Sequence, residues 1–251
     1  MTRLAEGSSV HFTILATPRS GSNMLCGLLN THSDCVCHHE LFNPKGVRLA
    51  LHLRNPEPNL AGLPDRQAKP LAFMQAVMER WPGLHATGMK MTGIQDRHAF
   101  AHILATVTMR KILLKRCNTL RELVSHKIAE QLNQWEVYDG DMLVHHRPRV
   151  TVEVDELERR ARVNQQHYQS IVKRLQADRQ EYLEVSYERL LGNDRHTTIA
   201  GVLDFLELSP SDDLELVSVR QNPQPLNELL ENYDQLRHRL SDTVYHWQLD
   251  E

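Results

Sequence analysis

A short run of basic and small residues near the amino terminus is the first place where the chain could do chemistry. In ILATPRSGSNML, residues 14–25, an apolar β-rich run breaks at Pro18, and a helix-like pattern resumes at Met24. A strand, a tight polar turn and a helix direct unpaired backbone N–H groups and the positive end of a helix dipole at one point. The turn is therefore expected to bind an anion through Pro18, Arg19, Ser20, Gly21, Ser22 and Asn23. Taken alone, the stretch also fits an ordinary turn capped by Ser22.

The turn differs from the phosphate loop of nucleoside triphosphatases. That loop needs Gly-x-x-x-x-Gly-Lys followed by Ser or Thr, whereas Gly21 is followed by Ser22 and Asn23. The missing Lys would contact the β- and γ-phosphates, and the missing hydroxyl would hold Mg²⁺. A P-loop-like kinase is therefore the second hypothesis.

A second cation is followed closely by a hydroxyl in KILLKRCNTLRELVSHKIA, residues 111–129. The apolar run predicts a strand that ends at Arg116, and Ser125 follows nine residues later on the next helix. A guanidinium and a hydroxyl placed in this way can converge on one phosphate. Taken alone, the stretch also fits a surface Arg and a helical Ser.

Three candidate bases lie together in CVCHHELFNP, residues 35–44. Glu40 falls at the end of a short apolar run, and His38 or His39 could also remove a proton near neutral pH. Cys35 and Cys37 add further metal-ligand types, but their spacing is unlike common zinc pairs and no second Cys/His cluster follows. No metal site is expected, and both cysteines are expected in the core.

Alternating strands and helices should position these residues. Strands are predicted at His11–Thr17, Cys35–His38, Ala86–Thr92, Arg110–Arg116 and Glu181–Ser186. Helices are predicted at Leu71–Trp81, Phe100–Val107, Thr119–Trp135, Glu153 to about Asp178, from Tyr187, from His196, and near Leu226–Leu240. This order predicts an α/β fold of three layers, with a central parallel sheet flanked by helices and the ligand beyond the carboxyl ends of the strands. Residues 1–251 are expected to form one domain, with acceptor-side loops near 43–70 and 137–150.

Composition excludes several classes of partner. The chain has 251 residues, 41% of them hydrophobic, with a net charge of −3, which gives no general electrostatic case for nucleic acid. No stretch approaches the roughly 20 apolar residues of a membrane span, and no signal-peptide region is apparent. Four cysteines in a chain of this length suit a reducing compartment, so a cytoplasmic location is expected.

Together the two anion-binding stretches resemble the sulfotransferases that use 3′-phosphoadenosine 5′-phosphosulfate (PAPS) and have a P-loop-like fold. TPRSGSNML resembles their 5′-phosphosulfate loop, and the stretch from Arg116 to Ser125 resembles their 3′-phosphate element. EVSYERLLGN with IAGVLDFLEL resembles their C-terminal region, and VRQNPQPLNELLENYDQL resembles the tail of bacterial members that sulfate carbohydrates or secondary metabolites. The matches run from Phe12 to Leu236. Asn23 and Cys117 depart from the family pattern, where a hydroxyl residue and a second basic residue are usual.

The resemblance implies in-line transfer of a sulfuryl group from PAPS to a hydroxyl of a carbohydrate, lipid or other small-molecule acceptor, without a metal, and it allows a homodimer. Arg19 and the amides of residues 20–23 would hold the phosphosulfate, while Arg116 and Ser125 would select the 3′-phosphate. Arg220 is a weaker candidate for contact with the nucleotide. Glu40 is the expected base and His39 or His38 the alternative, while Lys90 is left outside the catalytic set. Candidates to stack on the acceptor are Trp81, Trp135 and Tyr138. A non-catalytic nucleotide-binding protein on the same fold is a further alternative.

Overall fold

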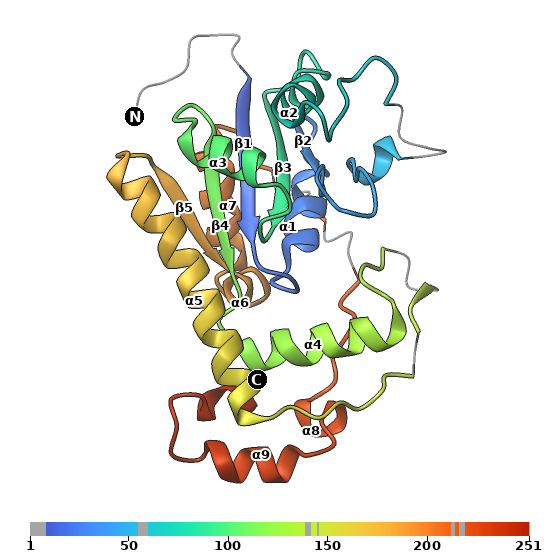
Figure 1. Ribbon diagram of the computed structural model, residues 1–251, viewed down its shortest axis with the longest axis vertical. Coiled ribbons are helices and arrows are strands. Elements are labelled where there is room, and N and C mark those ends of the chain that lie inside the picture. Colours follow the sequence, from blue (N-terminus) through green and yellow to red (C-terminus); the bar gives the residue numbers. More distant parts are fainter. Residues whose placement is uncertain are drawn as a thin grey trace.

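The chain folds around a five-stranded parallel sheet with the strand order β2-β3-β1-β4-β5. The computed structural model describes residues 9–54, 60–138, 142–144, 146–211, 214–215 and 219–250. The strands are β1 (Val10–Ala16), β2 (Cys35–His38), β3 (Ala86–Thr92), β4 (Arg110–Lys115) and β5 (Tyr182–Ser186). The α/β fold with a central parallel sheet is confirmed (Figure 1).

Helices cover both faces of the sheet. One face packs against α1 (Ser22–Leu29), α6 (Tyr187–Leu191) and α7 (Arg195–Phe205). The other packs against α2 (Pro70–Met78), α3 (Arg97–Ala105) and α5 (Val154–Ala177). Alternate residues of a strand point to opposite faces, so Ile14 belongs to the first core cluster and Leu15 to the second. Burial on both faces explains why these strands are continuous apolar runs.

A third group of helices lies beyond the carboxyl ends of the strands. It contains α4 (Thr119–Leu132), α8 (Leu226–Leu229), α9 (Tyr233–Leu240) and the 3₁₀ turn η3 (His246–Leu249), which share a core of their own with the start of α5. Figure 1 shows α4 crossing below the strand ends, with α8 and α9 beneath it. Asn118 caps α4 by accepting a hydrogen bond from the Arg121 amide at 2.8 Å. These helices therefore form a separate layer that faces the carboxyl ends of the strands.

Four helix predictions need correction. The helix expected at Phe100–Val107 runs from Arg97 to Ala105, because the Asp96 side chain caps it. The expected helix near Leu226–Leu240 is two helices, because Val150 pairs with the chain between them: its N–H donates to the Leu229 carbonyl at 2.8 Å and its carbonyl accepts from the Glu231 amide at 3.0 Å. The helix from Thr119 ends at Leu132, where Asn133 turns into the left-handed region with φ 47°. The helix after residue 70 ends at Met78 rather than Trp81.

The long loop after β2 contains the 3₁₀ turn η1 (Leu51–Leu53). Residues 55–59 of that loop, and residues 139–141 and 145 of the predicted insertion at 137–150, lie outside the described residues. Within the described part of the chain, no helix combines the length and apolar character that a membrane crossing requires.

Candidate active site

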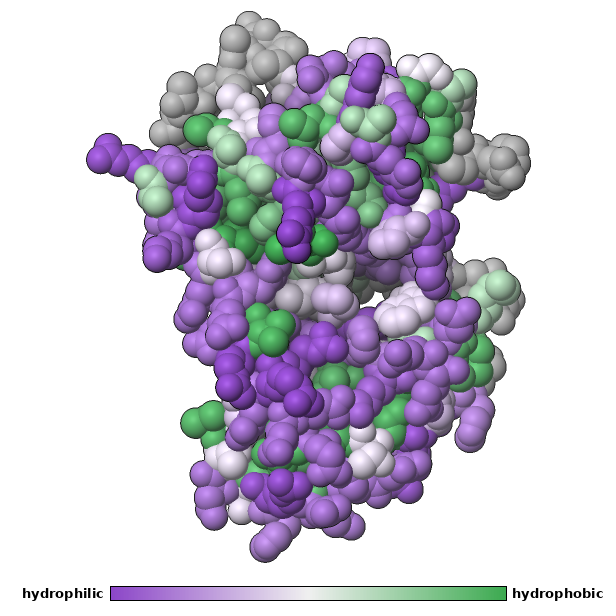
Figure 2. All heavy atoms as spheres, viewed as in Figure 1, coloured by the Kyte–Doolittle hydropathy of each residue, from purple (hydrophilic) through white to green (hydrophobic). Residues whose placement is uncertain are grey.

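A cavity of about 510 Å³ lies at the carboxyl ends of the strands, between the sheet and α4. Its walls come from the turn after β1, the ends of β2, β3 and β4, helix α4, and the segments 135–137 and 219–222. Figure 2 shows a hollow on this face between the part that holds the sheet and the lower helices. Of the residues predicted for the cofactor, all line the cavity except Ser20: Pro18, Arg19, Gly21, Ser22, Asn23, Arg116, Ser125 and Arg220.

The turn after β1 has a backbone that only certain residues tolerate. Arg19 has φ 66° and Gly21 has φ 88°, both in the left-handed region. A Cβ atom on Gly21 would lie 2.2 Å from Cδ2 of Tyr187, so the aromatic ring also excludes a side chain there. The Ser20 hydroxyl is buried and donates to the Thr17 carbonyl at 2.7 Å, which holds the turn from inside. α1 then begins at Ser22 without a side-chain cap, which leaves its first N–H groups available.

The two predicted anion-binding elements meet through direct hydrogen bonds. Arg19 Nε donates to Ser125 Oγ at 3.0 Å, and Arg116 Nη1 donates to the Arg19 carbonyl at 3.1 Å. Asn222 Nδ2 also donates to Ser125 Oγ, at 3.2 Å. Because the Ser125 oxygen accepts two hydrogen bonds, its own O–H is left to donate to a ligand. The Arg19 guanidinium therefore lies beside the second element.

Positive charge is concentrated at this end of the cavity. Burial, together with repulsion from the nearby Arg116, lowers the pKa of Arg19 to about 10. Burial also lowers the pKa of Arg116, whose guanidinium lies 4.6 Å from the centre of the Tyr187 ring. Repulsion between buried cations is relieved when an anion binds between them.

Buried polar atoms without a partner, at the Arg19–Arg116 end of the cavity, show whether its residues fit a phosphorylated nucleotide. Arg116 Nε, Asn23 Oδ1 and Asn222 Oδ1 are buried without a hydrogen-bond partner, and all three residues line the cavity. A guanidinium N–H suits a phosphate oxygen, and amide oxygens accept from N–H or O–H groups of a base or ribose. These residues fit such a ligand.

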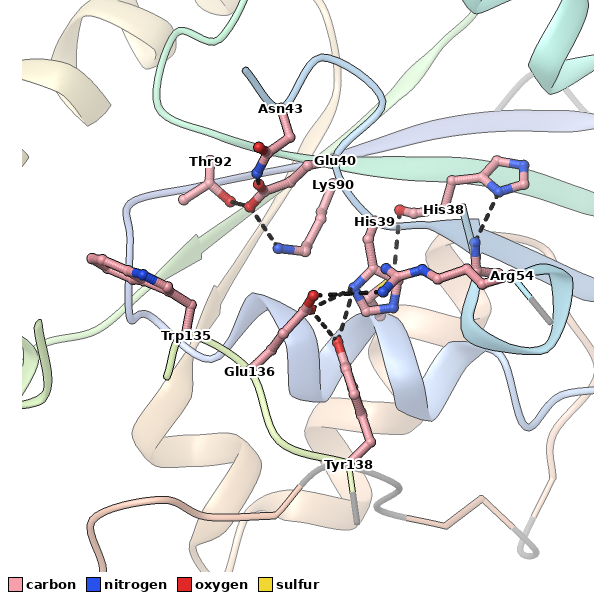
Figure 3. A network of polar contacts seen from close by, with 12 residues as sticks. His38, His39, Glu40, Asn43, Arg54, Lys90, Thr92, Trp135, Glu136 and Tyr138 are labelled. Carbon is pink, nitrogen blue, oxygen red and sulfur yellow. Dashed lines mark hydrogen bonds and ion pairs between the residues drawn. The ribbon is translucent and has the colours of Figure 1, made fainter. Parts of the chain in front are cut away.

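Glu40 lies at the other end of the cavity in a network of three donors (Figure 3). Lys90 Nζ and Thr92 Oγ1 both donate to Glu40 Oε1 at 2.8 Å, and Asn43 Nδ2 donates to Oε2 at 2.5 Å. Burial alone would raise the pKa of Glu40, but the Lys90 ammonium and these hydrogen bonds lower it to about 2. Glu40 is therefore a carboxylate at neutral pH.

The two neighbouring histidines face different surroundings. His39 is 1% exposed and lines the cavity, with Nδ1 3.1 Å from the Tyr138 hydroxyl, which donates to Glu136 Oε2 at 2.8 Å. His38 points away from the cavity: its Nδ1 accepts from the Ala50 amide at 3.3 Å, and burial lowers its pKa to about 3. His38 is therefore removed from the set of candidate bases.

The three aromatic residues that were expected to stack on the acceptor lie in different surroundings. Trp135 lines the cavity and is 38% exposed, as a stacking surface requires. Trp81 instead packs against the second core cluster and the His38 ring, 4.7 Å away, and Tyr138 is occupied by His39 and Glu136. Trp81 and Tyr138 do not line the cavity, so their predicted stacking role is wrong.

Sequence reasoning missed Lys90 and Tyr187. Lys90 stands in the apolar strand GMKM and is 5% exposed, and a buried Lys needs a carboxylate or hydrogen-bond partner, so its position was itself a signal. Tyr187 carried no comparable signal, because its contact with Gly21 depends on how α6 returns to the turn. Cys35 and Cys37 are buried free thiols, and among the described residues no group of three His, Cys, Asp or Glu could hold a metal ion.

Known proteins resemble this chain in sequence and in fold. No protein-family model matches the sequence. Nodulation protein H of Rhizobium meliloti (strain 1021) is 28% identical over 239 residues, 93% of this chain and 92% of that protein. Nodulation protein H of Rhizobium tropici is 27% identical over 237 residues, 93% of this chain and 90% of that protein.

Among solved structures, the sulfotransferase domain from the Synechococcus PCC 7002 olefin synthase has a TM-score of 0.50 and 20% identity, covering 91% of this chain and 82% of that one. This likeness establishes the fold. The chain is therefore similar over nearly its whole length to nodulation protein H, and it shares the fold of a sulfotransferase domain, with the two anion-binding elements at the strand ends.

Proposed function

We propose that this cavity transfers the sulfuryl group of PAPS to a hydroxyl of a carbohydrate or other small-molecule acceptor. The observation that carries the proposal is the joining of the two anion-binding elements by the Arg19–Ser125 hydrogen bond, with the Glu40 carboxylate in the same cavity. PAPS, when bound, supplies the sulfuryl group and the phosphate leaving group. The protein supplies charge, position and a proton acceptor.

The nucleotide end would act by fixed charge. The N–H groups at the start of α1 would bind the 5′-phosphosulfate and stabilise the negative charge that develops on the leaving oxygen. Arg116 and the free O–H of Ser125 would bind the 3′-phosphate. Arg19 would contact both groups, because its backbone belongs to the turn and its guanidinium contacts Ser125. Arg220 is exposed at the rim of the cavity and would add long-range attraction.

Glu40 is the proposed base, and its hydrogen bonds indicate which oxygen would act. A carboxylate offers about four acceptor positions, two on each oxygen. Lys90 and Thr92 occupy Oε1, whereas Asn43 takes one position on Oε2. The remaining position on Oε2 is therefore where an acceptor hydroxyl would donate its proton. With a pKa of about 2, Glu40 is a weak base that accepts the proton as the new O–S bond makes the hydroxyl acidic.

The first test is calorimetric titration with 3′-phosphoadenosine 5′-phosphate (PAP) without Mg²⁺, beside ADP without Mg²⁺ and ATP with Mg²⁺. We expect PAP to bind at least tenfold more tightly than ADP. Arg116→Ala should remove that preference, because ADP lacks the 3′-phosphate, whereas Arg162→Ala on the solvent face of α5 should not. Preference for ATP with Mg²⁺, or no nucleotide binding, would contradict the proposal.

A second test separates the base from nucleotide binding. Glu40→Gln keeps the size of the side chain but cannot take up the proton, so it should bind PAP as the unaltered chain does and lose at least 100-fold in sulfuryl transfer. Full transfer activity in Glu40→Gln would exclude Glu40 as the base and leave His39 as the candidate.

The location of the reaction is also a proposal. All four cysteines are free thiols, and three of them are buried. Free thiols are typical of a reducing compartment, which supports the expected cytoplasmic location.

A further inference from the structure

We propose that the acceptor carries an anionic group, a carboxylate or a phosphate, which binds to Arg48 and Lys45 beside Glu40. This inference rests on the proposed function and defines the substrate class more closely. Both residues line the cavity on the segment 43–48, which begins three residues after Glu40.

The segment 43–48 is held against Glu40 by backbone hydrogen bonds. The Glu40 carbonyl accepts from the amides of Asn43 at 3.3 Å and Arg48 at 3.1 Å, and the Lys45 amide donates to Asn43 Oδ1 at 2.9 Å. Arg66 Nη1 holds the segment from outside by donating to the Asn43 carbonyl at 2.8 Å. The backbone of Arg48 is therefore fixed next to the proposed base.

Neither cation pairs with a carboxylate among the residues that the structure describes. In the described part of the chain, the side chains of Lys45 and Arg48 make no hydrogen bond or ion pair. The nearby carboxylates are engaged elsewhere: Glu40 pairs with Lys90 at 2.8 Å and Glu136 with Arg54 at 3.5 Å. Arg48 is also half-buried, which makes an uncompensated charge more costly than at an exposed site.

The charge of the whole cavity leads to the same conclusion. Among the described residues that line it, seven are Lys or Arg and two are Glu, although the chain carries a net charge of −3. Lys90 is paired to Glu40, Glu136 is paired to Arg54, and Arg121 is engaged by the chain itself. Five lining cations remain for a ligand: Arg19, Lys45, Arg48, Arg116 and Arg220. PAPS brings about four negative charges at neutral pH. About one positive charge is left over before an acceptor binds, and Lys45 and Arg48 are the cations beside the base.

The test measures anion binding after the nucleotide site has been filled. With the protein saturated by PAP, inorganic phosphate, glycerol 3-phosphate and glycerol are titrated separately at low ionic strength, and binding is followed by calorimetry. We expect phosphate and glycerol 3-phosphate to bind once per chain with millimolar dissociation constants, and glycerol not to bind measurably. Arg48→Gln should weaken both anions at least fivefold, and Lys45→Gln should weaken them about twofold to threefold.

Matched controls assign the result to this part of the cavity. Arg162→Gln and Lys69→Gln make the same charge changes at exposed positions outside the cavity and should leave anion binding unaltered. Absence of anion binding to the PAP complex, or binding that Arg48→Gln does not weaken, would overturn the inference. It would also be overturned by phosphate binding without glycerol 3-phosphate binding, which would indicate a site for free anions. A loss of PAP affinity in Arg48→Gln would assign Arg48 to the nucleotide instead.

The proposed function is judged separately by PAP binding itself. If PAP does not bind, the proposed function fails. If PAP binds and neither anion does, only the anionic acceptor is refuted.

Discussion

Replacing Lys90 with Met should destabilise the protein by leaving the Glu40 carboxylate buried without its cation. Glu40 is 16% exposed, and its pKa of about 2 depends on the Lys90 ammonium 2.8 Å away. If loss of that ammonium returns the pKa to the ordinary value of 4.5, the difference at about 1.4 kcal/mol per pKa unit is about 3 kcal/mol at neutral pH. Losses of this size are typical when one partner of a buried ion pair is removed.

The effect should depend on pH in a defined direction. Because the folded-state pKa of Glu40 is lowered, its stabilisation is full above pH 4.5 and is lost as the pH falls through about 2. The difference between the unaltered chain and Lys90→Met should therefore be constant near neutrality, shrink below pH 4.5, and reach about half its neutral value near pH 3.

Urea unfolding followed by circular dichroism at several pH values measures this difference. Lys69→Met, at an exposed position, is the matched control and should change the free energy of unfolding by less than about 0.5 kcal/mol. Glu40→Gln combined with Lys90→Met should recover most of the loss, because no charge then remains buried alone. A loss below about 1 kcal/mol at pH 7, or one that stays the same from pH 7 to pH 3.5, would refute the reasoning.

Three further changes test other parts of the structure. Gly21→Ala should lower PAP affinity at least tenfold, because the added Cβ would lie 2.2 Å from the Tyr187 ring. Gly62→Ala, also at positive φ but in open space, should leave PAP affinity unchanged. Equal effects of the two variants in calorimetry would contradict the steric argument. Asn118→Ala should cost about 1–2 kcal/mol in urea unfolding through loss of the α4 cap, and no measurable change would show that the cap is dispensable. Tyr138→Phe should cost about 1–3 kcal/mol, because the buried His39 ring loses its hydroxyl partner, and an unaltered unfolding midpoint would argue against that hydrogen bond.

Much of the fold could be predicted because buried parallel strands have a simple signature. The strands at Cys35–His38 and Ala86–Thr92 lie where the apolar runs place them, and Arg116 and Ser125 of KILLKRCNTLRELVSHKIA line the same cavity. The break near Leu230 could not be predicted, because it depends on a backbone pairing with Val150, eighty residues earlier.

The contacts inside the site were harder to predict for two physical reasons. Arg19 reaches Ser125 from a left-handed backbone conformation that is unusual for a residue other than glycine, and the sequence carries no signal for it. The Glu40–Lys90 pair depends on which residues of β2 and β3 lie side by side, and the two are fifty residues apart. The buried position of Lys90 indicated that its ammonium has a partner, but not that the partner is Glu40.

The pairing of β2 with β3 determines where this protein can change length. His38 lies opposite Met89, and the Lys90 amide donates to the His39 carbonyl at 3.2 Å, so Lys90 reaches Glu40 in only one register. Side chains alternate between the faces of a strand, so inserting or deleting one residue before Lys90 would turn the ammonium into the hydrophobic core and present a methionine to Glu40. Insertions in the loop between β2 and α2 leave that register intact. Length variation among functional relatives is therefore expected in the loop and not within β3.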